Sequence, residues 1–178
     1  MRRPWLVLVV VALAGAAGCG DAPSNASSDP TEQFTQGGVS MEPAVKAGQV
    51  ITVRKLAAAY QPKRGDVVLF HGDQAHWVGT SSPLLKRVVA IGGETVACCT
   101  VAGKVTVNGE PLDEAYVAQD AALEVPPNPA SCESRRFGPV MVPKDAVFLM
   151  GDNRGRSNDS RCAGPVPVAA VFGVMSGN

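Results

Sequence analysis

The chain has 178 residues, and its 16 basic and 16 acidic side chains leave no formal net charge. This length allows one domain with a real hydrophobic core and is short for two, and the lack of any basic block argues against a nucleic-acid partner. Aromatic residues are scarce while glycine and proline are plentiful, which favours short strands and turns over long helices.

The N-terminus has the features of an export signal. Two arginines precede an apolar run that passes into small residues before Cys19, which is the order found in secretory signals. The run is about 14 residues long, shorter than the ~20 that span a bilayer as a helix. Residues 16–19 also resemble a bacterial lipobox. Residues 1–19 are therefore expected to be a lipoprotein signal with lipid on Cys19, a short uncleaved anchor, or an ordinary secretion signal, and all three place the domain outside the cytoplasm.

The next two segments differ in character. Residues 20–36 are polar, rich in serine and proline, and have almost nothing to bury, so we expect a flexible tether. The remaining residues, 37–178, are expected to form the folded domain. Near its start, Ser40 lies between two glycines and Pro43, which suits a loop with unusual backbone angles that exposes a hydroxyl. A lone serine is usually only a turn residue, so its importance depends on its neighbours in space.

Short apolar runs alternate with turn residues along the domain and indicate strands. The expected strands are 50–53, 66–70, 86–91, 94–97, 104–107 and 146–150. The pair Asn108-Gly109 predicts a hairpin turn because both residues tolerate positive φ. Residues 118–138 form a polar excursion that we expect to be a loop or small flap. The expected architecture is a mainly β, single compact domain built from short strands.

Lys86 opens one of these apolar runs. One interpretation is an edge-strand lysine that stays in water and discourages aggregation. The other is a lysine drawn into apolar surroundings, where desolvation lowers its pKa until the amine is neutral near pH 7. A neutral amine beside a serine hydroxyl can take its proton and return it to the leaving group. Since side chains alternate along a strand, Lys86 and Arg87 should point to opposite faces.

The cysteines after residue 19 form an even set: Cys98, Cys99, Cys132 and Cys162. In an exported domain this set predicts two disulfides, with three possible pairings. We expect the neighbours Cys98 and Cys99 not to bond each other, because a vicinal bridge is strained, and each should reach either Cys132 or Cys162. A metal site is disfavoured because adjacent cysteines lack the usual spacing of zinc ligands.

Residues 151–161 are rich in Gly, Asn, Asp and Ser and directly follow an apolar run. Alone, such a segment is typical of a surface turn. Asp159 and Arg161 are close enough in sequence to form an ion pair that locks it. Ser157 is then placed to hydrogen-bond Lys86 and hold it toward Ser40, as a third group orients the base in a Ser-His-Asp triad.

Four segments in this order resemble the boxes of type I signal peptidases, S26-family serine endopeptidases with a Ser/Lys dyad. The matching segments are 38–43 for the nucleophile box, 64–70 for a structural box, 86–94 for the base box and 151–161 for the last box. Residues 107–112 are also similar to a hairpin of the family. The resemblance covers nearly all of the expected domain and implies a signal-peptidase-like β fold.

The resemblance also implies a role for each candidate site residue. The roles are nucleophile and oxyanion-binding backbone N–H for Ser40, general base for Lys86, orienting hydroxyl for Ser157, supporting ion pair for Asp159 with Arg161, and substrate pocket for Met41 and Pro43. No metal or organic cofactor is implied. Some members carry a second oxyanion serine where this chain has Gly38, so oxyanion stabilisation must depend on backbone donors.

The resulting hypothesis is a membrane-tethered, extracytoplasmic serine endopeptidase that removes signal peptides from exported preproteins through an acyl-enzyme. The family resemblance implies small residues before the cut, and an extended peptide is expected to bind by strand addition. Its expected partners are exported preproteins and the membrane surface. Two alternatives stay open: a processing peptidase dedicated to one exported substrate of the conjugation or pilin type, and an inactive lipoprotein that binds peptides.

Overall fold

The computed structural model describes residues 30–177 apart from 58, 76, 78–81 and 129–131. Its larger sheet has seven strands, namely β1 (Thr31–Thr35), β2 (Val50–Lys55), β3 (Val67–His71), β4 (Pro83–Ile91), β9 (Ala146–Met150), β10 (Val166–Pro167) and β11 (Val171–Met175). They lie in the order β1-β2-β11-β3-β4-β9-β10. Every adjacent pair is antiparallel. The order places β4 between β3 and β9, in the interior of the sheet.

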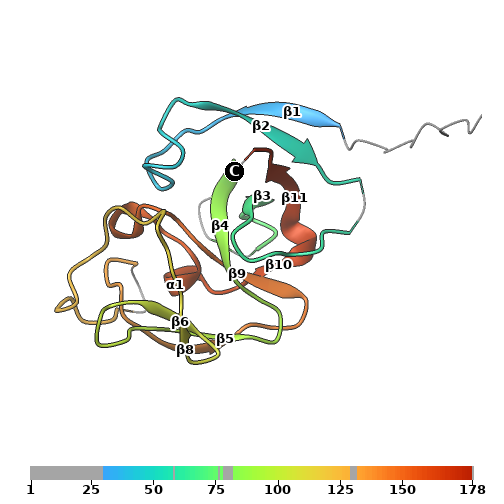
Figure 1. The fold of residues 1–178 in the computed structure, drawn as a ribbon. Coiled ribbons are helices and arrows are strands. Elements are labelled where there is room, and N and C mark those ends of the chain that lie inside the picture. Colours follow the sequence, from blue (N-terminus) through green and yellow to red (C-terminus); the bar gives the residue numbers. More distant parts are fainter. Residues whose placement is uncertain (1–29, 58, 76, 78–81, 129–131, 178) are drawn as a thin grey trace, which may run out of the picture.

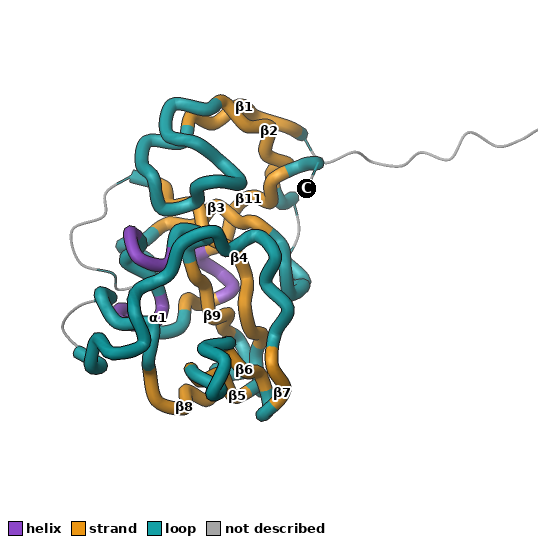
Figure 2. Tube along the Cα trace, turned by 60° about the vertical axis from the view of Figure 1, so that its left-hand side comes forward, coloured by secondary structure: helices purple, strands orange, loops and turns teal. Residues whose placement is uncertain are grey.

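A second sheet has four strands in the order β7-β6-β5-β8. Their bounds are β5 (Thr95–Cys98), β6 (Val105–Val107), β7 (Glu110–Pro111) and β8 (Phe137–Met141). The short helix α1 (Ser160–Ala163) and two 3-10 turns, Arg154–Arg156 and Val168–Ala170, complete the described elements. In Figures 1 and 2 the β1–β2 ribbon lies at one end of the molecule and the second sheet at the other, with β4 and β9 running between them.

Strand β4 is buried on both faces. Val88 belongs to one apolar cluster together with Phe70 on β3, whereas Val89 belongs to a different cluster that includes Val96 on β5. As a result, all five residues 86–90 are buried. A polar side chain on this strand is therefore held in the interior, where it needs a hydrogen-bond partner or loses its charge.

The sequence prediction of a mainly β fold is confirmed. Each of the six expected strands overlaps an observed one, and the predicted turn residues Asn108 (φ 53°) and Gly109 (φ 86°) connect β6 to β7. The described part of 118–136 contains neither helix nor strand, whereas residues 137 and 138 belong to β8. Of the strands that were not expected, β7 and β10 are two residues long, β8 contains proline, β1 is mostly polar and β11 contains glycine, so each carries little local signal.

The tether prediction for residues 20–36 is wrong at its C-terminal end. Residues Thr31–Thr35 form β1 and pair along their whole length with β2, with Phe34 opposite Ile51. Phe34 also packs against an apolar cluster that contains Ile51. A full ladder and one aromatic anchor thus order a polar segment, which its composition alone did not reveal.

Some predictions fall on residues outside those that the structure describes. These are the export signal at 1–19, with its candidate lipidation site Cys19, and the first part of the tether, 20–29. Within the described part of the chain, no helix has the length and apolar character needed to cross a membrane.

Candidate active site

Ser40 lies in the loop between β1 and β2, on a turn that is anchored to the core by the side chain of Met41. The Met41 side chain is fully buried in an apolar cluster with Leu85, and its carbonyl accepts a hydrogen bond from Val45 N at 2.9 Å. This anchoring fixes the backbone next to Ser40. Met41 was predicted to line a substrate pocket, but here it supports the turn, because its apolar side chain is stabilised by burial in the core.

Lys86 contacts Ser40 directly. A hydrogen bond of 2.9 Å joins Lys86 Nζ and Ser40 Oγ, and Nζ also donates to the Leu85 carbonyl at 3.1 Å. The Lys86 side chain is buried, with 4% exposed. Burial lowers its pKa from 10.5 to about 8, against the opposing attraction of Asp159 and Asp152. A substantial fraction of this amine is therefore neutral in mildly alkaline solution and able to accept a proton.

Arg87 points to the other face of β4, as strand alternation predicts. Its Nε and Nη2 donate to the two carboxylate oxygens of Asp152 at 2.8 and 2.7 Å. Its Nη1 donates to the Gly65 carbonyl at 2.9 Å, and its guanidinium carbon lies 4.2 Å from the centroid of the Tyr116 ring. This buried bidentate pair fastens the start of segment 151–161 to the strand that carries Lys86.

Segment 151–161 approaches Ser40 through its backbone. Asn153 N donates to the Ser40 carbonyl at 3.0 Å. A Cβ at Gly151 would lie 2.5 Å from that same carbonyl oxygen and would also collide with the Ser157 side chain. Only glycine allows this close approach, so a larger residue at position 151 would push the segment away from Ser40.

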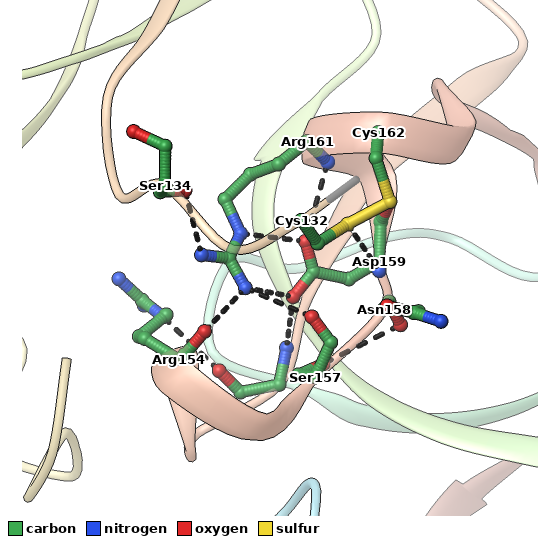
Figure 3. The surroundings of a disulfide bond; sticks show 9 residues. Cys132, Ser134, Arg154, Ser157, Asn158, Asp159, Arg161 and Cys162 are labelled. Carbon is green, nitrogen blue, oxygen red and sulfur yellow. Dashed lines mark hydrogen bonds and ion pairs between the residues drawn. A yellow bond between two sulfur atoms is a disulfide. The ribbon is translucent and has the colours of Figure 1, made fainter. Parts of the chain in front are cut away.

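Arg161 organises the interior of this segment (Figure 3). Its Nε and Nη2 donate to the Asp159 carboxylate at 2.8 and 2.9 Å. The same guanidinium donates to the carbonyls of Ser134, Arg154 and Ser157. Burial raises the pKa of the Asp159 carboxyl, but the Arg161 charge and backbone N–H donors outweigh it and hold the pKa below its usual value. The ion pair anticipated from the sequence is thus present and fully buried.

Ser157 is buried beside Gly151, but the hydrogen bond predicted between Ser157 and Lys86 is not formed in the structure. The Ser157 hydroxyl donates to the Asn158 carbonyl at 3.4 Å, while the partners of Lys86 Nζ among the described residues are Ser40 and Leu85. Ser157 therefore shapes the space around Gly151 rather than holding the lysine directly.

Two residues of the loop after β7 complete the site and were missed by the sequence analysis. Glu114 forms an ion pair with Arg154, and Tyr116 lies under Arg87. Arg154 is 1% exposed and also donates to the Gly151 carbonyl at 3.0 Å. A buried arginine needs a carboxylate partner, but no periodic pattern in the sequence indicates which acidic residue supplies it.

The cysteine pairing differs from the prediction. The sulfur atoms of Cys98 and Cys99 lie 1.91 Å apart, and those of Cys132 and Cys162 lie 1.93 Å apart. The expectation that the two neighbours avoid each other is therefore wrong. Proximity in the folded domain decides the pairing. Cys98 ends β5 and Cys99 directly follows it, whereas Cys132 and Cys162 meet because both contact the Asp159 backbone.

A hollow of about 360 Å³ opens beside the loop between β1 and β2, which carries Ser40. It is lined by Glu42, Pro43, Ala118, Gln119 and Asn153. Of the two residues predicted to form a substrate pocket, Pro43 lines this hollow, whereas Met41 is fully buried and is not among its lining residues. Among the described residues, no group of three His, Cys, Asp or Glu side chains is placed to hold a metal ion.

Comparisons with known proteins agree with one another. The family profile described as "Signal peptidase, peptidase S26" matches residues 5–177. Signal peptidase I of Mycobacterium tuberculosis (strain H37Rv) is 36% identical over 177 residues, covering 75% of this chain and 60% of the relative. Signal peptidase I of Leptolyngbya laminosa is 33% identical over 138 residues, covering 75% and 61%. The chain thus spans about three fifths of the length of these relatives.

One solved structure is also similar. The crystal structure of a signal peptidase I from Enterococcus faecalis V583 is 28% identical and has a TM-score of 0.49. The match covers 67% of this chain and 100% of that one.

Replacing Lys86 by methionine should flatten the pH dependence of the unfolding free energy between about pH 8 and 10.5. In the wild type the folded amine has a pKa of about 8 and the unfolded one 10.5. The unfolded state therefore binds more protons in this window, and stability rises with pH. The expected rise is about 3 kcal/mol from this one group, measured by urea unfolding at a series of pH values.

The matched control is Lys46→Met, which removes an exposed lysine close to Ser40 in sequence. It should retain the wild-type pH dependence, because an exposed amine is hydrated in both states. Other titrating groups are common to all three proteins and cancel in the comparison. Equal slopes in the wild type and Lys86→Met would contradict the lowered pKa.

Proposed function

The chain belongs to the peptidase S26 family of signal peptidases, and we propose that it is a serine endopeptidase that cleaves signal peptides from exported preproteins. The observation that carries this proposal is the 2.9 Å hydrogen bond between buried Lys86 and Ser40. A serine hydroxyl next to an amine of lowered pKa is the arrangement required for nucleophilic catalysis with a lysine base. Two relatives named signal peptidase I, at 33–36% identity, support the same class of reaction.

In the proposed mechanism, neutral Lys86 takes the proton of Ser40 Oγ as this oxygen attacks the scissile carbonyl carbon. The tetrahedral intermediate collapses to an ester on Ser40, and the Lys86 ammonium gives its proton to the departing amine. Water then attacks the ester carbonyl. Lys86 takes one proton from this water and returns it to Ser40 Oγ, which releases the acid product and restores the starting state.

The oxyanion of the intermediate needs a hydrogen-bond donor. The backbone N–H of Ser40 makes no hydrogen bond to any described residue, so we assign it this role. Gly38 stands at the position where some family members have a second donor. A Cβ added at Gly38 would meet nothing within 4 Å, so this position has room for a side chain.

The remaining residues of the site act by positioning. The Arg87–Asp152 pair and the Asp159–Arg161 pair are both buried. The first joins β4 to segment 151–161, and the second holds that segment together. Ser157 fills the space beside Gly151. Pro43 lines the hollow next to Ser40 and is proposed to contact substrate, with small residues before the cut as in the family.

We further propose that the domain lies outside the cytoplasm and is tethered at the membrane surface. The supports are the export-signal character of residues 1–19 and the two cysteine pairs at bonding distance, since disulfides persist in exported proteins. Lipid on Cys19 would attach the domain without a spanning helix. The proposed substrates are therefore exported preproteins at the membrane.

Ser40→Ala and Lys86→Met should each reduce cleavage of a preprotein with small residues before the cut, by about 10⁴-fold or more. The first change removes the nucleophile and the second removes the base. The measurement is the rate of product formation by purified protein, with Lys46→Met as a control that should keep wild-type activity.

Full cleavage by either site variant would disprove the mechanism. A wild-type protein that binds the preprotein but never cuts it would instead favour the peptide-binding lipoprotein. Cleavage of one exported protein among many would favour the dedicated processing peptidase.

Gly38→Ser should raise kcat by about threefold to tenfold, because it adds a hydroxyl donor near the developing oxyanion. This gain in kcat should be smaller than the loss in kcat that follows when a well-placed oxyanion donor is deleted from an enzyme. Gly37→Ser is the matched control, since a Cβ there also meets nothing within 4 Å but lies one residue further from Ser40. An unchanged or lower kcat in a stably folded Gly38→Ser variant would contradict the oxyanion assignment.

The intact mass of protein extracted from membranes should show lipid on Cys19 and the loss of four thiol hydrogens. The two bonded cysteine pairs account for the missing hydrogens. Cys19→Ser should abolish the lipid mass and release the domain from the membrane fraction. A mass with four free thiols would refute the disulfides, and an unlipidated mature protein would refute the lipid tether.

A further inference from the structure

The side-chain amide of Asn153 has hydrogen bonds at one end only. Its Nδ2 donates to the Val39 carbonyl at 3.2 Å. The residue is only 5% exposed, and its Oδ1 is buried without a hydrogen-bond donor among the described residues. A buried acceptor without a partner has lost its hydration with nothing in return, so this oxygen is a place where a bound hydrogen-bond donor would add stability.

The orientation of this amide is fixed by its neighbours. If the amide were flipped, Oδ1 would face the Val39 carbonyl oxygen, and two acceptors would repel each other. The backbone N–H of Asn153 is also occupied, because it donates to the Ser40 carbonyl at 3.0 Å. Asn153 is thus held against the backbone of Val39 and Ser40, with one acceptor free.

Asn153 lines the hollow of about 360 Å³ together with Pro43 and Gln119. Neither Gly38 nor Ser40 is among the residues that line this hollow. The hollow is therefore separate from the place where the scissile carbonyl meets the Ser40 N–H. A polypeptide held at Ser40 must continue away from that point, and the hollow is near it, because the lining residue Asn153 contacts the Ser40 carbonyl.

The chemistry of Oδ1 restricts what it can bind. An amide oxygen only accepts hydrogen bonds, so it repels an oxyanion and attracts an N–H. Main-chain N–H groups are present in nearly every residue of a polypeptide, whatever its sequence, which suits an enzyme that acts on many preproteins. We propose that Asn153 Oδ1 accepts a hydrogen bond from a main-chain N–H of the polypeptide bound at Ser40. This inference rests on the proposed endopeptidase function and assigns Asn153 as a substrate-binding residue.

The test compares a cleavable peptide with versions N-methylated singly at the second and third residues on either side of the cut. In the wild type, one of these methylations should lower kcat/KM by about threefold to tenfold, the effect of losing one hydrogen bond. Asn153→Ala should show a similar loss with the parent peptide. It should show almost no further loss with the sensitive methylated peptide, because the bond is already absent.

Gln119→Ala provides the matched variant. It changes another polar side chain that lines the same hollow and leaves Asn153 in place, so it should remain sensitive to the same methylation. Equal sensitivity to methylation in the wild type and Asn153→Ala would overturn the proposal and assign the amide only to bracing Val39. A loss of methylation sensitivity in Gln119→Ala would also overturn it, because the effect would then not be specific to Asn153. These outcomes are distinct from failure of the proposed function, in which Ser40→Ala would still cleave the parent peptide.

Discussion

The desolvation of Lys86 is the constraint on which the rest of the site depends. The lysine is in the middle of the larger sheet, on a strand covered on both faces. Water cannot stabilise its charged form there, and its pKa falls to about 8. The fold thus makes it easier for this amine to lose its proton and places it 2.9 Å from Ser40 Oγ, as the proposed general base requires. Burial of Met41 anchors the loop that carries the serine.

The other buried cations of the site show how selective this effect is. Arg87, Arg154 and Arg161 each form an ion pair with a carboxylate. Lys86 forms no such pair with any described residue, and it feels Asp159 and Asp152 only as more distant charges. A carboxylate in direct contact would favour the protonated amine. The arginines therefore hold the acidic groups in fixed positions, and Lys86 remains free to lose its proton.

The sequence predicted the parts of this site that depend on local pattern. The strand around Lys86, the opposite directions of Lys86 and Arg87 and the turn at Asn108 follow from strand periodicity and turn chemistry. Other parts depend on tertiary contacts: β1 becomes a strand because it pairs with β2, and Cys132 meets Cys162 beside the Asp159 backbone.

The Glu114–Arg154 pair and the absence of a Ser157–Lys86 hydrogen bond also depend on tertiary contacts. The first is set by loop packing and the second by the orientation of the Ser157 hydroxyl.

The most direct test of the claim that Lys86 acts as a neutral base is the rate at which a peptide-like acylating inhibitor modifies the protein as a function of pH, with the modified residue identified by mass spectrometry. A neutral lysine base predicts modification of Ser40 at a rate that rises with pH and levels off with a midpoint near the Lys86 pKa of about 8. A rate independent of pH, or an adduct on another residue, would contradict it.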